Sequence, residues 1–587
     1  LPMIPDFIRL ADHVFFDGAA FIISFVLLGN FLEGRAKLKA TDAVHSLMKL
    51  QPREVRIFIE GDTQILPIED VPKGSFVKVI AGEIIPLDGI IHKGAGTIDE
   101  SMMTGESLPK YKEAGHEVFA GTIIQDTTIL IETTSLVGDT MLSKIIRLVD
   151  EAQMGKAPIQ RLVDNVARIF VPSVLLFSIS ASLFWLMFGD SVLSGIGSNT
   201  TPSEMAVMTL VSTLVIACPC ALGLATPTAL VVGTGVGARN GLLIKGIKAL
   251  ETSYKSKIVI LDKTGTITIG RPQVEEIREL GGETGEALRI AAALEGESGH
   301  PLAIAVNDAW RSSGREKPTI SDIKTHIGSG MIGKIEGFEV AVGSLEMIRN
   351  MVNEIPSEVE SEISEKSLSG SNVILVSKNR NLVGWIEIRD VIRENSPLAV
   401  ERMQDMGIEV IMLTGDRQEV AEYIASKVGI KRVVSGLKPE EKADAIRRLQ
   451  KEGIVTMIGD GINDAAALTV ADVGIAMGAG SEIALDSADI VLVGDDLSHV
   501  LSVLQLSRAT MNKIRSNLVW AFLYNILGIP LAMGLLFPWT GWLLPPAFAA
   551  AAMALSSVSV VLNSVLLTRW KPVNLDSGNN TKAISSL

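Results

Sequence analysis

Three short apolar runs in the second half of the chain each end in residues that can bind phosphate and Mg²⁺. They are KIVILDKTGTIT, with Asp262; EVIMLTGDR, with Thr414 and Asp416; and IVTMIGDGIND, with Asp460 and Asp464. Buried strands of a parallel sheet are continuous apolar runs of this kind, and their carboxyl ends face one crevice. We therefore expect these side chains to converge on a site of hard oxygen ligands suited to Mg²⁺ and phosphate.

The aspartate at the end of the first run has the chemistry of a covalent nucleophile, which would form an aspartyl phosphate. Lys263 follows it directly and Lys442 lies in GLKPEEK; both can neutralise charge on a transferring phosphoryl group. The alternative is that these are ordinary turn aspartates, because Asp and Gly are common in loops. Because three such turns occur at successive strand ends, we favour a phosphate and Mg²⁺ site over ordinary turns.

The only two cysteines of the chain, Cys218 and Cys220, flank Pro219 in the apolar stretch LVIACPCALGLATP. Proline has no N–H and clashes with the preceding turn, so we expect this helix to kink or unwind there. Interrupted membrane helices line cavities, and transporters place substrate sites at them. Thiolates at such a break select soft metals, including Cu(I) and Zn²⁺. The alternative is that both cysteines are small buried apolar residues.

Composition indicates that these sites belong to a membrane protein with large soluble parts. Hydrophobic residues make up 47% of the chain and charged residues 20%, a mixture typical of membrane spans joined to soluble domains. The apolar content makes the lipid bilayer the expected partner surface. The net charge of −14 argues against a nucleic-acid partner. The chain begins at Leu1, and we expect further spans upstream of it.

Five apolar runs approach the ~20 residues needed to cross a bilayer. Lys and Arg cluster near the ends that adjoin the soluble inserts, which places these inserts in the cytoplasm. The predicted spans are 14–32, 167–189, 206–228, 516–537 and 545–568.

Two soluble inserts separate these spans. The first, roughly 36–150, has short Val- and Ile-rich strands between Gly and Pro residues, which predicts a small β-rich domain. The second, roughly 245–510, alternates strand and helix patterns and should be α/β. Within it, residues 275–385 interrupt the parallel sheet and should form a separate lobe. This lobe contains a G-x-G-x-x-G pattern in IGSGMIG, which alone is weak evidence for nucleotide binding.

The motifs DKTGT at 262–266, TGES at 104–107, TGD at 414–416 and GDGIND at 459–464 together resemble the motif set of P-type ATPases. The resemblance covers essentially the whole chain. It implies a multidomain membrane protein: an α-helical transmembrane bundle, a β-rich actuator domain, and an α/β HAD-like phosphorylation domain carrying an inserted α+β nucleotide-binding domain. The implied boundaries are 1–35 for the first transmembrane span, 36–150 for the actuator domain, 151–244 for two spans, 245–274 and 386–510 for the phosphorylation domain, 275–385 for the nucleotide-binding domain, 511–570 for two spans and 571–587 for a polar tail.

The same resemblance implies that ATP and Mg²⁺ are cofactors and that Asp262 takes the γ-phosphoryl group of ATP. Glu106 of the actuator domain would position the water that hydrolyses the phosphoenzyme, a reasonable task for a carboxylate. Mg²⁺ would be held by Asp262, Thr264 and Asp460. The implied catalytic set is Asp262, Glu106, Lys263, Thr264, Thr414, Asp416, Lys442, Asp460, Asn463 and Asp464. The implied nucleotide-binding set is Glu295, His300, Gly328, Gly330 and Gly343.

Three positions depart from the family pattern. Ala466 stands where proline is usual, Gly299 where an acidic residue is usual, and Ser344 where asparagine is usual. The first change removes no reacting group, and the other two bear on the implied nucleotide site.

The fourth and fifth spans offer uncharged donors for a metal: Tyr524 and Asn525, then Met553 and Ser557. Neither span contains Asp, Glu, Lys or His at membrane depth. A thioether without a charged group suits a monovalent soft ion, whereas a divalent ion needs carboxylate or imidazole to balance its charge. The Tyr-Asn pair with M-x-x-S-S also resembles the copper(I) branch of the family.

The resemblance further suggests a route for the metal. Glu33 and Asp164 match the family's entry carboxylates, and Asp17 matches its exit group. The alternative is that Glu33 and Asp164 are interfacial charges near Arg35 and Arg161.

We therefore predict ATP-driven export of Cu(I) from the cytosol through an aspartyl-phosphate intermediate. A cytosolic copper donor or chaperone would be the partner, and the location would be the plasma membrane of a prokaryote. A zinc or cadmium pump of the same architecture is the nearest alternative. An alternative of another class is a metal-responsive membrane receptor that does not pump, and the intact Asp262, Glu106, Asp460 and Asp464 argue against it.

Overall fold

The structure is a computed structural model of the 587-residue chain. It describes residues 20–24, 27–28, 30–31, 34–35, 51–59, 62–101, 109–154, 158–196, 200–218, 220–280, 284–296, 298, 300–315, 318–326, 329–368, 370–460, 464–478 and 486–572. The chain divides into two compact units, one formed by residues up to 254 together with 502–572, the other by 255–501.

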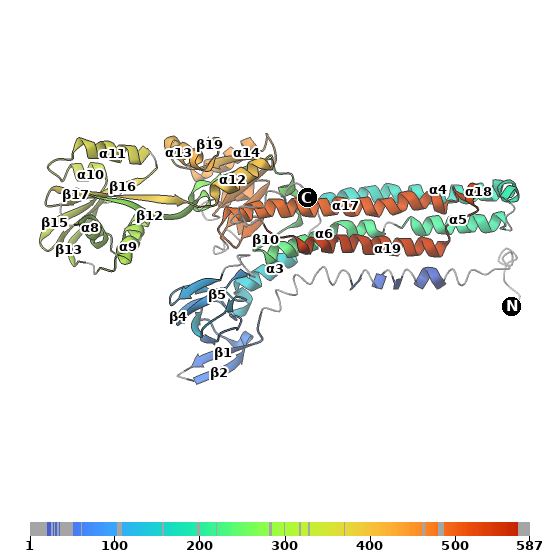
Figure 1. Ribbon diagram of the computed structural model, residues 1–587, viewed down its shortest axis with the longest axis horizontal. Coiled ribbons are helices and arrows are strands. Elements are labelled where there is room, and N and C mark those ends of the chain that lie inside the picture. The colour runs from blue at the N-terminus through green and yellow to red at the C-terminus, as the bar shows by residue number, and fades with distance from the viewer. Residues whose placement is uncertain are drawn as a thin grey trace. The chain divides into compact units, whose positions relative to one another are not determined.

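In the first unit, the segment after residue 50 forms a β-rich domain (Figure 1). One sheet has the order β2-β1-β3-β9-β4-β7 and a smaller sheet has the order β6-β5-β8. Their inward residues, among them Ile57, Val77 and Ile131, are buried in one core. The strands are β1 (Glu54–Ile59), β2 (Asp62–Pro67), β3 (Phe76–Val79), β4 (Gly89–Lys93), β5 (Ala95–Asp99), β6 (Lys110–Glu113), β7 (Glu117–Val118), β8 (Ile123–Ile124) and β9 (Ile129–Thr133).

The second unit contains a parallel sheet in which β22, β21, β20, β11, β18 and β19 are neighbours in that order. Every residue of β11, β20 and β21 is buried, as expected for strands covered on both faces. The strands are β11 (Ile258–Asp262), β18 (Glu409–Leu413), β19 (Arg432–Val434), β20 (Val455–Gly459), β21 (Val473–Met477) and β22 (Ile490–Leu492). The helices between them are α12 (Ser396–Asp405), α13 (Gln418–Val428), α14 (Pro439–Leu449) and α15 (Ala465–Val470).

Between β11 and β18 the chain forms a second, antiparallel sheet with the order β12-β17-β16-β15-β14-β13. Figure 1 shows α8 and α9 on one side of this sheet and α10 and α11 on the other. The alternation of strand side chains explains both layers: Val340 and Val342 pack with α8, whereas Ala341 packs with Ile348 of α10. The strands are β12 (Thr268–Glu279), β13 (Ile320–His326), β14 (Gly330–Ile335), β15 (Phe338–Gly343), β16 (Asn372–Lys378) and β17 (Asn381–Ile392). The helices are α8 (Glu286–Leu294), α9 (Pro301–Ser312), α10 (Leu345–Arg349) and α11 (Ser357–Leu368).

Long helices make up the rest of the first unit, and α4, α5, α6, α17 and α19 lie alongside one another (Figure 1). In the described part of the chain, three helical stretches are long and apolar enough to cross a membrane: Pro158–Gly195, Pro202–Arg239 and Pro546–Arg569. They contain three of the five predicted spans. The helices are α3 (Met141–Met154), α4 (Pro158–Ile196), α5 (Pro202–Ile216), α6 (Cys220–Arg239), α7 (Ile247–Tyr254), α17 (Leu497–Ala532), α18 (Phe537–Thr540) and α19 (Pro546–Val565).

The other two predicted spans have different outcomes. The run 14–32 lies largely outside the described residues. The run 516–537 overlaps α17, which begins at Leu497 and ends at Ala532. α17 is not among the three stretches apolar enough to span.

Candidate active site and metal site

The predicted convergence of three strand ends is seen in the structure. β11 lies between β18 and β20, and both neighbours run parallel to it. Asp262, the last residue of β11, is paired with Leu413, so Thr414 follows at the same edge. Leu261 is paired with Ile458 of β20, which brings Asp460 to this edge too.

Lys442 joins two of these carboxylates. Its Nζ atom lies 2.6 Å from Asp262 Oδ1 and 2.6 Å from Asp464 Oδ1. All three side chains are buried. Gly459 allows Asp464 to approach the strand end, because a Cβ at that position would lie 2.4 Å from Asp464 Oδ2. The sequence had suggested Lys442 as a phosphate anchor but gave no sign that it bridges two aspartates.

Burial shifts the pKa values of this trio, Asp262, Asp464 and Lys442. Burial raises the pKa of Asp262 to about 6; Asp464 acts in the same direction, and Lys442 opposes both. Burial likewise raises the pKa of Asp464, again against the effect of Lys442. Burial disfavours the charged ammonium of Lys442, but the two aspartates outweigh it and raise its pKa, so it stays protonated.

A second ion pair stands beside the first. Lys263 Nζ lies 2.6 Å from Asp416 Oδ2, which holds the lysine that directly follows Asp262 in place. The backbone N–H of Asp416 donates to Thr414 Oγ1 at 3.2 Å. Lys442 is therefore held by Asp464 at the Asp262 carboxyl, and Lys263 is held by Asp416. Both ammonium groups can neutralise charge on a transferring phosphoryl group.

The residues suggested for Mg²⁺ fit that ion in donor type. Thr264 donates its backbone N–H to Asp262 Oδ2 at 2.9 Å, which closes the turn after β11. Gly265 follows in the left-handed region, and a Cβ on it would lie 3.3 Å from Asp460 Cβ, so the turn lies against Asp460. Across the described residues, no group of three or more His, Cys, Asp or Glu side chains is placed to hold a metal. Asp262, Asp460 and an oxygen of Thr264 would therefore supply part of a hard-ion shell that phosphate and water complete.

Asp390 is a residue near this site that sequence reasoning missed. It lies in β17, where its Oδ2 accepts from Thr268 Oγ1 at 2.6 Å and its Oδ1 accepts from the Gly270 N–H at 2.9 Å. It thereby ties β17 to the start of β12, six residues after Asp262. No sequence signal marked it, because its partners are more than 100 positions away in the chain.

The glycines suggested for nucleotide binding form a close backbone contact. Gly330 of β14 is paired with Gly343 of β15. A Cβ on Gly330 would lie 2.2 Å from Val342 O and 2.5 Å from Gly343 Cα, and the φ of Gly330 is +151°. Neither strand end could carry a side chain there, so the two glycines let the backbones of β14 and β15 approach closely.

Glu295 and His300 lie at the facing ends of α8 and α9. Burial raises the pKa of Glu295, although His300 opposes this shift. His300 Nδ1 accepts from the Leu302 N–H at 3.3 Å and so caps α9. Gly333, in the strand that starts at Gly330, adjoins the end of α8, since its Cβ would lie 3.0 Å from Leu294 Cδ2. The end of α8 that precedes Glu295 therefore lies against β14, the strand that contains Gly330 and Gly333.

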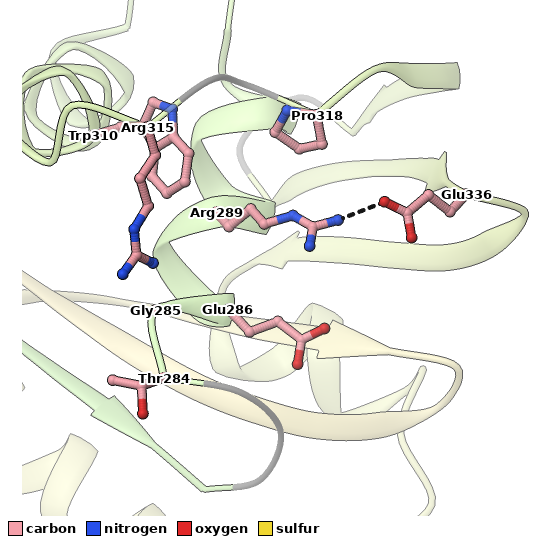
Figure 2. Close-up of a pocket in the computed structure, with 8 residues that line it drawn as sticks. All are labelled: Thr284, Gly285, Glu286, Arg289, Trp310, Arg315, Pro318 and Glu336. Atoms are coloured by element: carbon pink, nitrogen blue, oxygen red, sulfur yellow. Dashed lines mark hydrogen bonds and ion pairs between the residues drawn. The ribbon is translucent and has the colours of Figure 1, made fainter.

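The opposite end of α8 holds a separate pocket of about 390 Å³ (Figure 2). Arg289 and Arg315 line it, and Arg289 pairs with Glu336 at 2.9 Å. The first turn of α8 is met by Glu279, whose carboxylate accepts from the Ala287 N–H. Because Arg289 already has an acidic partner in Glu336, we assign this pocket no ligand.

In the membrane part, the predicted break is present: α5 ends at Ile216 and α6 begins at Cys220. Met553 of α19 and Ile216, the last residue before the break, belong to one apolar cluster. Tyr524 and Asn525 lie on α17, and Ser557 is buried on α19. Cys218 is disulfide-bonded in this structure, so a metal can bind its thiolate only in the reduced protein.

Six buried polar atoms of α5, α6, α17 and α19 have no hydrogen-bond partner among the described residues. They are Thr213 Oγ1, Thr226 Oγ1, Arg239 Nε, Thr510 Oγ1, Ser556 Oγ and Oδ1 of Asn525, a residue only 4% exposed. Buried polar atoms without partners are costly in a protein interior. Asn525 was expected to contact the metal, and its unpaired oxygen suits that role.

The structure does not place the remaining predicted residues at either site. Glu106, Asn463, Gly328, Glu33 and Asp17 lie outside the described residues. Asp164 is exposed on α4, in the second turn of that helix.

Comparisons with known proteins agree with this arrangement. Residues 49–150 match the family model for the P-type ATPase actuator domain, and residues 256–472 match that of haloacid dehalogenase-like hydrolases. The chain is 41% identical over 96% of its length to a probable copper-transporting ATPase, PacS, of Synechococcus elongatus, and covers 74% of that protein. It is 39% identical over 98% of its length to a probable copper-exporting P-type ATPase of Archaeoglobus fulgidus, and covers 70% of it.

A solved structure resembles the whole chain as well. It is a zinc-transporting PIB-type ATPase in the E2.Pi state, with a TM-score of 0.62 and 31% identity. The match covers 94% of this chain and 87% of the other.

Proposed function

This chain belongs to the P-type ATPase family, and on that basis we propose that it exports Cu(I) from the cytosol at the expense of ATP. One observation carries the choice of metal: the buried candidate ligands Asn525, Met553 and Ser557, which α17 and α19 would add to the thiols, are uncharged. α19 contains no Asp, Glu, Lys, Arg or His. Two thiolates and a thioether suit Cu⁺, whereas Zn²⁺ would lack good ligands for a tetrahedral shell.

The phosphorylation step uses residues of the trio and its neighbours. An Asp262 carboxylate oxygen attacks the γ-phosphorus of ATP, the bond from that phosphorus to the β,γ-bridging oxygen breaks, and ADP leaves with the electron pair. Lys442 and Lys263, held by Asp464 and Asp416, balance the charge of the transferring group. Mg²⁺ bound at Asp262, Thr264 and Asp460 would supply further charge neutralisation and orient the phosphate.

The remaining assignments rest on family membership. Glu295, His300, Gly328, Gly330 and Gly343 would bind the nucleotide, with Thr414 and Asn463 near the phosphate. Glu106 would activate the water that hydrolyses the aspartyl phosphate. The domain boundaries follow the same family pattern, with the antiparallel sheet as the nucleotide-binding domain.

Metal would enter past Glu33 and Asp164, bind Cys218 and Cys220, and leave past Asp17. A cytosolic copper donor or chaperone would deliver it, because free Cu⁺ would react with other thiols. Both named relatives are prokaryotic, and we place this chain in the plasma membrane of such a cell.

The test is ATPase activity against a panel of metals, presented with a thiol buffer under reducing conditions. Cu⁺ and its mimic Ag⁺ should activate, Zn²⁺ and Cd²⁺ should not, and Met553→Ala should weaken activation by Cu⁺. Stronger activation by Zn²⁺ than by Cu⁺ would replace the copper assignment with a zinc pump, the function of the solved structure that resembles this chain. No activation by any metal would favour a receptor that does not pump.

A further inference from the structure

A hydrogen-bond network joins the three helices that carry the candidate metal ligands. At its centre is Asn517 of α17, which is 0% exposed. Its Nδ2 donates to Ala225 O of α6 at 3.0 Å and to Ser564 Oγ of α19 at 2.8 Å. Its Oδ1 accepts from Asn563 Nδ2 of α19 at 2.8 Å. Both N–H groups and the oxygen of this one side chain are therefore used between helices.

The network extends along α17 and α19. Asn563 Nδ2 also lies 3.2 Å from Ser516 Oγ, and Asn563 Oδ1 accepts from Lys513 Nζ at 3.1 Å. Ser564 Oγ, which receives the Asn517 donation, donates in turn to Val560 O of its own helix at 2.9 Å. We call these side chains, Lys513, Ser516, Asn517, Asn563 and Ser564, with Ala225 O, the Asn517 network.

The network lies close to the candidate ligands along each helix. At 1.5 Å per residue, Ala225 is about 7.5 Å from Cys220 along α6, and Asn517 is about 12 Å from Asn525 along α17. Ser564 is about 10.5 Å from Ser557 along α19. The Asn517 network therefore fixes the rotation and the axial position of the three helices at a level one or two helical turns away from the metal donors.

We propose that Asn517 is a positioning residue for the transported metal: it holds α6, α17 and α19 in the register that brings their donors to one ion. The inference rests on the proposed function, because it takes the donors on these helices as the metal site. Hydrogen bonds between membrane helices are individually modest, but a broken network leaves buried polar groups unpaired. The helices would then settle at other rotations, and donors from three helices would no longer meet.

The test compares Asn517→Leu, which keeps the size of the side chain and removes every hydrogen bond, with the parent chain in lipid. Cu⁺ is the probe, presented with a thiol buffer. The half-activating Cu⁺ concentration for phosphorylation by ATP should rise about tenfold, while maximal turnover stays within about threefold. Phosphorylation by inorganic phosphate without metal should be unchanged, which a protein that is merely misfolded would not show.

Ser559→Ala is the matched control, because Ser559 Oγ donates within its own helix, to Leu555 O, at 2.9 Å. It should behave as the parent does. Asn563→Ala removes one of the bonds to Asn517 and should give a smaller shift in the same direction. If Asn517→Leu does not fold, Ser564→Ala, which removes a single acceptor, carries the same comparison.

An unchanged half-activating Cu⁺ concentration in Asn517→Leu overturns the inference, as does a fall in maximal turnover without such a shift. Failure of the proposed function looks different, because then the parent itself does not respond to Cu⁺. If the parent responds to another metal instead, the comparison of variants is made with that metal.

Discussion

Lys442 Nζ lies 2.6 Å from Asp262 Oδ1, although the two residues are 180 positions apart in the chain. This contact brings together the last residue of β11 and the first turns of α14. The same ammonium group holds Asp464, so the nucleophile, its cation and a second carboxylate form one electrostatic unit. A change in any one of them alters the ionisation of the other two.

That coupling predicts how phosphorylation depends on pH. Burial raises the pKa of Asp262 to about 6, and the nucleophile must be ionised, so phosphorylation by ATP should fall as the pH drops below about 6. Asp464→Asn removes a negative neighbour that raises this pKa, so the acid limb should move to lower pH. Lys442→Gln removes the opposing cation and should move the limb to higher pH. Initial rates of labelling with ATP, measured by rapid quench, give the three profiles. Identical acid limbs in all three proteins would contradict the coupling.

The glycine pair of β14 and β15 predicts a steric effect. Gly330→Ala places a Cβ 2.2 Å from Val342 O, and we expect a loss of stability of about 1–3 kcal/mol together with weaker ATP binding. Thermal unfolding and nucleotide titration measure the two effects. Gly337→Asn is the control: Gly337 also has a positive φ, +82°, but a Cβ there meets nothing within 4 Å, and Asn tolerates this conformation. Equal losses in both variants would mean that backbone strain, not the close contact, is responsible.

The break between α5 and α6 predicts the order of events. If Cys218 and Cys220 form the site that licenses phosphorylation, changing both to Ser should abolish metal-dependent labelling of Asp262 by ATP. Labelling by inorganic phosphate, which needs no metal at that site, should remain. The measurement is acid-stable incorporation of phosphate from either source. Unchanged ATP labelling in the double variant would remove the cysteines from this role.

Glu106 supplies a prediction about the second half of the cycle. Glutamine cannot take a proton from water, so Glu106→Gln should form the phosphoenzyme normally and then retain it. A chase with unlabelled ATP measures its decay. Decay at the parental rate would show that another group acts as the base.

The sequence predicted some parts of this protein better than others, for physical reasons. The strand ends at Asp262, Thr414 and Asp460 were predictable because fully buried parallel strands leave a local mark, a continuous apolar run. The interruption before Cys220 was predictable because proline acts on its own helix.

Contacts between distant segments left no such mark. The pairing of Lys442 with Asp464, the role of Asp390 in joining β17 to β12, and the hydrogen bonds of Asn517 all depend on which elements become neighbours. The apolar run 516–537 marked only the second part of α17, because the part that begins at Leu497 is more polar.

The division of the chain into two units falls inside α17, between residues 501 and 502. In a continuous helix, the number of residues between two side chains sets both the angle between them around the helix axis and their separation along it. Each residue turns the chain by about 100° and advances it by about 1.5 Å. One residue inserted after residue 501 would therefore turn Tyr524 and Asn525 by about 100° with respect to the helix start at Leu497. An insertion of four residues would turn them by only about 40° beyond a full circle, despite a displacement of about 6 Å. If α17 transmits rotation, metal-dependent phosphorylation should suffer more from the insertion of one residue than from the insertion of four; equal effects of the two insertions would contradict this.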